Sequence, residues 1–169
     1  ARIAATTPGD ALRGQQTIMK LQRCPTSPSG HPALLQYMTY LISQTKLNEI
    51  ESVEFCRQVI NLGKGQLIEN WIKEDKLTPT EQLGDLCKPF DLRIALAIYL
   101  RASASAKICA SFAEMGAFDK IAAYCQQFNY QPDWLQIVTL IARSNPDGLG
   151  KLLTHIANGG QPLMDPKQV

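Results

Sequence analysis

Hydrophobic residues recur at helical spacing along almost the whole chain. From about residue 31 to residue 158 the apolar positions follow a period near 3.6, and hardly any stretch alternates with a period of two. Helix starts recur roughly every 12–17 residues, so helix pairs repeat about every 25–33 residues, close to the spacing of helical solenoids. Short connections between such helices favour antiparallel neighbours. The pattern predicts an all-α fold, an α-solenoid built as a zigzag of antiparallel helix hairpins.

The residues around the first helices indicate where these helices begin and end. Pro32 suits the first position of a helix, and Asn48 with Glu51 three residues later has the pattern of a capping box. The segment "LGKG" that ends at Gly65 supplies glycine just beyond the end of a helix, so we interpret it as a helix terminus and not as a phosphate-binding loop.

The stretch "ENWIKEDKLTPTEQLGDL" (69–86) combines charges, an aromatic residue and a proline. Glu69 and Lys73 have the i, i+4 spacing of a solvent-exposed helix pair. We expect Thr78 to be the N-cap of the next helix, with Pro79 at its first position and Glu81 at its third. The stretch is therefore interpreted as a helix, a capped corner and a second helix.

Capping and helix-ending residues also predict the boundaries of the later helices. Ser103 is the expected N-cap of the helix in "SAKICASFAEMG", and Gly116 is its expected end. Pro132 and Asp133 are expected to start another helix, and a last one is expected to begin near Asn145. The residues expected to face inward are Leu34, Leu35, Met38, Leu41, Ile42, Ile50, Val53, Cys56, Val59, Ile60, Leu67, Ile68, Trp71, Ile72, Leu83, Leu86, Cys87, Ile108, Cys109, Phe112, Phe118, Ile121, Ala122, Cys125, Trp134, Leu135, Val138 and Ile141.

Two regions differ in composition. Residues 1–30 contain a short helix, expected from about Gly14 to Arg23, followed by the proline- and serine-rich connection "CPTSPSGHP". Residues 31–169 form the predicted helical repeat. Because the sequence starts at Ala1 without methionine and stops in "MDPKQV", we expect it to be a segment of a longer polypeptide.

Charge and cysteine content exclude several function classes. The net charge is +2 and the basic residues are scattered, so no nucleic-acid partner is expected. No apolar run has the roughly 18 residues that a membrane-spanning helix needs, and direct membrane insertion is not expected. Five cysteines without a close pair predict neither a disulfide framework nor a metal knuckle. Cys56, Cys87, Cys109 and Cys125 are expected to be small buried apolar residues in a reducing cytosol.

Candidate chemistry is sparse. The two histidines, His31 and His155, have no evident partners for catalysis or for zinc. Trp71 and Trp134 are interpreted as core residues, since no basic groove accompanies them. We therefore predict that the chain is not an enzyme and has no catalytic, cofactor-binding or metal-binding residue and no cofactor. A helical groove that receives a peptide remains an open alternative.

A set of phrases resembles one family along most of the chain. In order, these are "LLQY", "LNEIESVEFCR", "LIENWIKEDKL", "EQLGDL", "ALAIYLRA", "SFAEMG" and "YQPDW". Their order and spacing resemble the clathrin heavy chain from about Ala4 to the C-terminus. The segments 9–32 and 154–169 follow the family pattern only loosely, which indicates a divergent homologue.

The resemblance implies a structural coat protein. Residues 1–30 would be the end of the linker that follows the N-terminal β-propeller, and residues 31–169 the first large helical repeat of the ankle and distal leg. In this family, heavy chains trimerise at their C-termini, and their legs interdigitate in the lattice of coated pits and vesicles on the cytosolic side of membranes. Adaptors and light chains bind regions with no counterpart here. Two alternatives stay open: a clathrin-repeat scaffold of a membrane-tethering complex and a peptide-binding helical adaptor.

Overall fold

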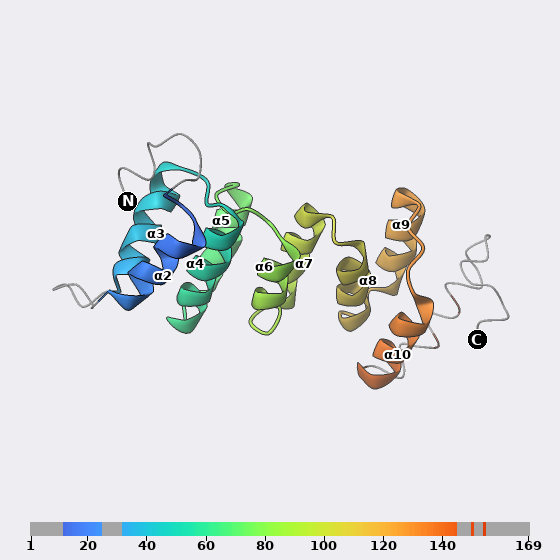
Figure 1. The fold of residues 1–169 in the computed structure, drawn as a ribbon. Coiled ribbons are helices and arrows are strands. Elements are labelled where there is room, and N and C mark those ends of the chain that lie inside the picture. The colour runs from blue at the N-terminus through green and yellow to red at the C-terminus, as the bar shows by residue number, and fades with distance from the viewer. Residues whose placement is uncertain (1–11, 25–31, 145–149, 151–153, 155–169) are drawn as a thin grey trace. The chain divides into compact units, whose positions relative to one another are not determined.

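The computed structural model describes residues 12–24 and 32–144 together with Gly150 and Thr154. Every regular element among these residues is a helix, as the α-solenoid prediction requires. The chain divides into two compact units, residues 1–102 and 103–169, each of which is described by itself (Figure 1). The helices are α2 (Gln15–Arg23), α3 (Ala33–Gln44), α4 (Glu49–Asn61), α5 (Gln66–Lys73), α6 (Glu81–Cys87), α7 (Leu92–Ala102), α8 (Ser105–Glu114), α9 (Phe118–Phe128) and α10 (Trp134–Ser144).

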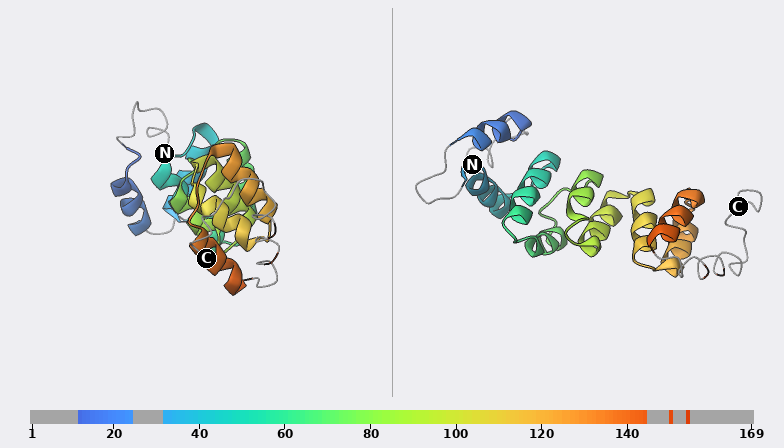
Figure 2. Two further views of the ribbon diagram at one scale, coloured as in Figure 1. Left: turned by 90° about the vertical axis from the view of Figure 1, so that its right-hand side faces the viewer. Right: turned by 90° about the horizontal axis from the view of Figure 1, so that it is seen from below.

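The N-terminal unit is a stack of short helices. Its helix α2 packs on α3, α3 on α4, α4 on α6, and α7 on both α6 and α5. Each helix thus touches near neighbours in the sequence, which is the arrangement of a solenoid. Figure 2 shows these helices side by side. The helices and the connections between them bury Leu34, Met38, Leu41, Leu47, Phe55, Cys56, Ile68, Leu77, Leu83, Cys87, Ile98 and Tyr99.

The C-terminal unit is built around helix α8, which packs against both α9 and α10. Gly116, at a φ of +70°, makes the tight turn between α8 and α9, as expected from its position. Asn129 adopts the left-handed conformation just beyond α9, another common helix end. Ile108, Ile121 and Ile141 are fully buried in this unit.

The signals predicted around α2 and α4 are confirmed, whereas Pro32 is the N-cap of α3 and not its first residue. Asn48 and Glu51 form a complete capping box at the start of α4, in which each side chain accepts a hydrogen bond from the other residue's backbone N–H. Helix α4 ends at Asn61, and Gly63 follows with a φ of +71°. The "LGKG" segment is therefore a helix terminus. The expected helix from Gly14 to Arg23 is also present as α2.

The predicted cap of α6 was wrong by two residues. Thr80, not Thr78, is the N-cap, and its hydroxyl accepts a hydrogen bond from the backbone N–H of Leu83 at 3.2 Å. Thr78 instead donates its hydroxyl to the carbonyl oxygen of Leu47 at 2.6 Å. Its backbone N–H donates to the hydroxyl of Ser52. These long-range hydrogen bonds hold Thr78 in the corner, so the helix starts later.

We expect Thr80→Ala to lower the free energy of unfolding by about 1 kcal/mol, because it leaves a backbone donor at the start of α6 without its cap. Thr80→Ser keeps the hydroxyl and is the matched control, for which we expect little change. Urea unfolding followed by circular dichroism measures both. Equal stability of the alanine variant and the parent would show that the cap contributes nothing.

Some inward assignments were also wrong. Ile50, Leu67 and Leu135 are 43%, 41% and 69% exposed, respectively. In α4 the buried face starts at Glu51 and Ser52, one residue later than the apolar pattern indicates. Sequence patterns place glutamate on the solvent side, but here an ion pair compensates its burial. The other residues of the predicted inward set are buried or half-buried.

Two further predictions for the C-terminal unit have different outcomes. Ser103 is not a helix cap: it has a left-handed φ of 56°, and Ala104 takes the N-cap position of α8. A serine in this conformation turns the chain before the helix instead of capping it. Helix α10 begins at Trp134, directly after Pro132 and Asp133, as predicted. The helix predicted from Asn145 lies outside the described residues.

Gly84 on α6 lies against the ring of Tyr99 on α7. A Cβ atom built at this position would lie 2.2 Å from the ring of Tyr99 on α7. Tyr99 is fully buried, and its hydroxyl donates to the carboxylate of Asp85 at 2.6 Å. Only a glycine therefore allows α6 to lie this close to the aromatic ring.

Trp134 is buried as predicted, whereas the prediction for Trp71 is only partly confirmed. Trp71 is half-buried, and its ring stacks on the buried ring of Phe55 with the centroids 4.9 Å apart. Replacing Trp71 with alanine should lower the free energy of unfolding by about 2–3 kcal/mol through lost packing and stacking. Trp71→Phe keeps a ring and should lose less than half of that in the same urea titration. An alanine variant as stable as the parent would contradict a packing role.

Candidate interaction surfaces

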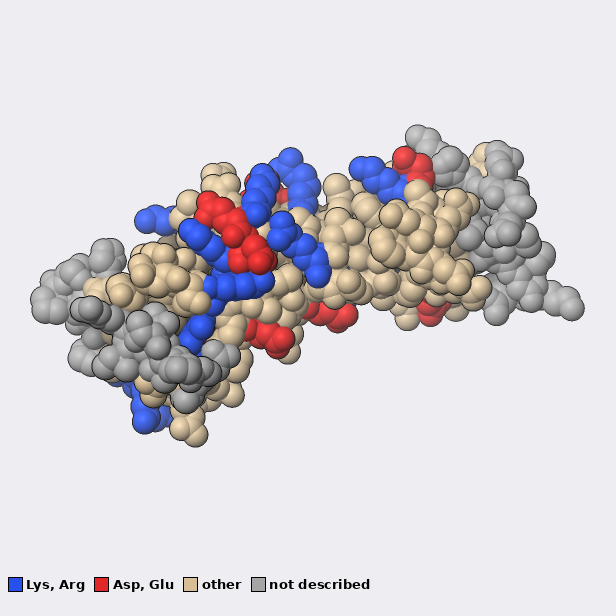
Figure 3. Space-filling model, turned by 90° about the horizontal axis from the view of Figure 1, so that it is seen from above, with Lys and Arg blue, Asp and Glu red and all other residues tan. Residues whose placement is uncertain are grey.

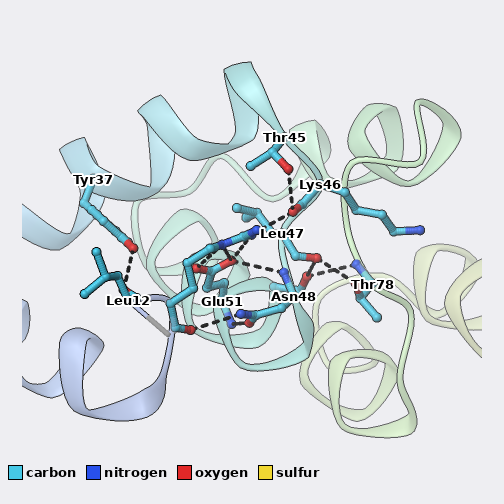
Figure 4. Close-up of polar contacts among 10 residues, drawn as sticks. Leu12, Tyr37, Thr45, Lys46, Leu47, Asn48, Glu51 and Thr78 are labelled. Atoms are coloured by element: carbon cyan, nitrogen blue, oxygen red, sulfur yellow. Dashed lines mark hydrogen bonds and ion pairs between the residues drawn. The ribbon is translucent and has the colours of Figure 1, made fainter. Parts of the chain in front are cut away.

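A buried ion pair joins the segment before α2 to the start of α4. The side chain of Glu51 is fully buried, and the Nε of Arg13 donates to its Oε1 at 3.0 Å. Arg13 also donates through Nη2 to the carbonyl oxygen of Lys46 at 2.7 Å. The amide of Asn48 donates to the carbonyl oxygen of Arg13 at 3.0 Å. We call these four residues the Glu51 junction (Figure 4).

Tyr37 extends this junction on α3. Its hydroxyl donates to the carbonyl oxygen of Leu12 at 3.3 Å, next to Arg13 in the sequence. Burial and the nearby Glu51 carboxylate raise the pKa of Tyr37, and the Arg13 guanidinium opposes this shift. The tyrosine is thus neutral and remains a hydrogen-bond donor at neutral pH. The whole arrangement fixes the segment before α2 against α3 and α4, which is a structural task.

A charged groove lies between α5 and α7. Its floor is formed by Ile72, Ile94 and Ala97, and its volume is about 220 Å³. That volume is below the roughly 300–1,000 Å³ of typical small-molecule sites. The charged residues around the floor are Glu69, Lys73, Asp91, Arg93 and Arg101.

Four of the five charges of the groove are paired with one another, and the fifth, Arg101, lies 3.9 Å from Asp75 outside the groove. Lys73 lies 2.6 Å from Glu69, as expected from their spacing, and Arg93 lies 3.3 Å from Asp91. Hydrogen bonds from Arg93 lower the pKa of Asp91. Figure 3 shows acidic and basic side chains interspersed on one face of the N-terminal unit. Such a surface neutralises itself and does not form a one-sign track for a polyanion.

The cysteines lie where the apolar pattern puts them. Cys56, Cys87, Cys109 and Cys125 are buried, and Cys24 is exposed. Burial raises the pKa of Cys87 to about 12, and that of Cys56 is raised by burial and by Cys87. Thiols of this kind are poor nucleophiles at neutral pH.

Groups of three or more potential metal ligands do not occur among the described residues. His31 and His155, the two histidines, lie outside them. The predictions that the chain has no catalytic, cofactor-binding or metal-binding residue therefore stay predictions. In the part of the chain that the structure describes, no helix is both long and apolar enough to span a bilayer.

Sequence reasoning missed the residues that organise the N-terminal unit. Arg13 was given no role, and it is separated from Glu51 by 38 positions. The contact of Thr78 with Leu47 spans 31 positions. No signal in the sequence pointed to these contacts, because the apolar pattern does not place Glu51 inward and its basic partner is distant in the chain.

The fold and these surfaces define a helical-repeat protein whose polar contacts join neighbouring helices. The comparisons with known proteins identify the relatives. Residues 1–41 match the clathrin H-link family. The chain is 45% identical over 170 residues to the clathrin heavy chain of Dictyostelium discoideum, and 43% identical over 173 residues to a probable clathrin heavy chain 1 of Caenorhabditis elegans. It is 37% identical over 169 residues to clathrin heavy chain 2 of Homo sapiens.

The chain is thus homologous to clathrin heavy chains over its whole length, and the resemblance drawn from its motifs is confirmed. Each of these alignments covers 100% of this chain and 10% of the relative. The chain therefore spans about a tenth of the length of these relatives. The boundary between a linker end at residues 1–30 and a helical repeat at 31–169 stays a prediction.

Proposed function

We propose that the chain is a structural strut, a leg segment of a clathrin triskelion that takes part in the polyhedral coat of pits and vesicles. The observation that carries this proposal is the homology to clathrin heavy chains along the full sequence. The stacked helices support it, because a solenoid spreads bending over many small interfaces between neighbours. The coat would act in endocytosis and intracellular transport on the cytosolic face of membranes.

The polar contacts agree with a mechanical task. The Glu51 junction and Tyr37 fix the segment before α2 to α3 and α4, and Thr78 fixes the corner before α6 to the segment before α4. Hydrogen bonds of this kind set the angle between helices, since they are directional and apolar packing is not. In the coat, the partners would be other heavy chains, while trimerisation, light chains and adaptors would use regions outside this segment.

Cell fractionation tests the proposal. An antibody raised against this chain should detect a band many times larger than 18.7 kDa. That band should sediment with coated vesicles and be released by the basic amine buffers that strip coats. A large band on late endosomal or vacuolar membranes would instead favour a membrane-tethering scaffold. A band near 18.7 kDa without vesicle association would contradict the coat proposal and favour an independent adaptor.

A further inference from the structure

Two buried cysteines stand at the same level of the α8–α9 hairpin. Cys109 on α8 and Cys125 on α9 are each eight residues from Ala117, which lies at the turn. In an antiparallel hairpin, residues at equal distances from the turn lie opposite each other. Both side chains are buried, with 1% and 3% exposure, and α8 packs against α9. The fold therefore brings together two thiols that are 16 positions apart.

The two thiols lie within hydrogen-bonding reach of each other. A hydrogen bond between them lowers the pKa of Cys125 and, together with burial, raises that of Cys109. Cys109 is thus the donor, and Cys125 is the thiol that ionises first. A thiolate in contact with a second cysteine can attack that sulfur once it has been oxidised.

A small cavity reaches Cys109. It has a volume of about 90 Å³, and its lining includes Cys109, Ala106, Tyr130 and Ile137. A water molecule occupies about 30 Å³ in the liquid, so the cavity has room for a molecule as small as hydrogen peroxide. Cys109 is therefore the sulfur that such an oxidant reaches.

We propose that Cys109 and Cys125 form a reversible disulfide that joins α8 to α9 when the protein meets a small peroxide. The Cys125 thiolate takes the proton of the Cys109 thiol, and the Cys109 sulfur attacks one peroxide oxygen. The O–O bond breaks, a sulfenic acid forms on Cys109, and the released hydroxide takes up that proton and leaves as water. The Cys125 thiolate then attacks the Cys109 sulfur, the S–O bond breaks, and the oxygen leaves as a second water after protonation. The two thiols are oxidised by two electrons, and the peroxide is reduced to two waters. A dithiol reductant restores the pair.

The bond would close a short loop and restrain the opening of the hairpin. A cross-link of this size limits the freedom of the unfolded chain, so the oxidised hairpin opens less often than the reduced one. This is a modification site on a helix pair of the solenoid, and it does not depend on the coat proposal.

Peptide mapping under non-reducing conditions tests the inference. The folded 169-residue protein is treated with hydrogen peroxide, free thiols are blocked with iodoacetamide, and trypsin is added. Cleavage after Lys107, Lys120 and Arg143 separates peptide 108–120, which contains Cys109, from peptide 121–143, which contains Cys125. We expect these peptides to be linked with the loss of two hydrogen atoms and to be released by dithiothreitol. Oxidation of Met115 adds an oxygen to one peptide and is distinguished by mass.

The controls use the other cysteines of the chain. Cys125→Ala should abolish the linked product, whereas Cys56→Ala should leave its yield unchanged. If the Cys125→Ala protein does not fold, the inference is tested with the parent protein alone. Oxidation of the parent in urea should give a mixture of disulfide pairings, whereas oxidation of the folded parent should give mainly the 109–125 disulfide. Folded protein that is oxidised at the exposed Cys24 but gives no 109–125 link would overturn the inference.

Discussion

Replacing Gly84 with alanine will lower the free energy of unfolding by about 3 kcal/mol. The added Cβ would lie 2.2 Å from the ring of Tyr99, far inside van der Waals contact. Tyr99 cannot move away freely, because it is fully buried and its hydroxyl donates to Asp85. Helix α6 must therefore shift away from α7, which opens the packed interface between them. Urea unfolding followed by circular dichroism measures the loss.

Gly14→Ala is the matched control, because a Cβ at this position meets nothing within 4 Å. It makes the same chemical change at the N-cap of α2, where alanine is less favourable than glycine, and should cost no more than about 1 kcal/mol. A second variant, Gly84→Ala with Tyr99→Leu, replaces the ring that the Cβ meets. If the overlap with Tyr99 causes the loss, the two substitutions in this variant will cost less than the sum of their separate effects. Additive costs would show that the overlap with the ring is not the cause.

Replacing Glu51 with glutamine is expected to cost about 3–5 kcal/mol, because it removes one partner of a buried ion pair. Arg13, whose side chain is only 12% exposed, would keep its charge without the carboxylate. The capping box at the start of α4 would also lose its charged acceptor for the N–H of Asn48, which now donates at 3.1 Å. Both losses should appear as one drop in the urea midpoint.

Glu69→Gln is the control for the loss of a carboxylate at the surface. Glu69 pairs with Lys73 at 2.6 Å, but both side chains are more than half exposed. Exposed pairs of this type contribute only about 0.3–0.5 kcal/mol. The double variant Arg13→Met with Glu51→Gln should recover part of the stability, since it removes the stranded charge. If Glu51→Gln and Glu69→Gln lower the free energy of unfolding equally, the buried ion pair contributes no more to stability than the exposed one.

Local chemistry made much of the fold predictable. The capping box of Asn48 and Glu51 is confirmed because every group in it lies within four residues of the chain. The turn at Gly116 is confirmed for a similar reason, since only a local backbone preference is involved. The helical class itself follows from the apolar period, which requires no knowledge of distant contacts.

Contacts between distant residues explain the errors. Thr78 precedes a proline and has an acidic residue three positions later, as a helix N-cap often does. Its hydrogen bonds with Leu47 and Ser52 instead hold it in the corner before α6. Leu135 continued the apolar stripe of α10, yet the structure buries Ile137 in place of it because the packed face of the helix is set by α8. The pairing of Cys109 with Cys125 could not be predicted either, because it depends on the register of the hairpin.

The Glu51 carboxylate serves a nearby helix start and a distant arginine at the same time. Asn48 and Arg13 both donate to it, so neither contact can be lost without weakening the other. Such sharing is thermodynamic coupling. Hydrogen exchange should therefore report it: a substitution at Arg13 will raise the exchange of the first-turn amides of α4, 38 positions along the sequence, as well as that of α2. The two segments are expected to open as a single cooperative unit.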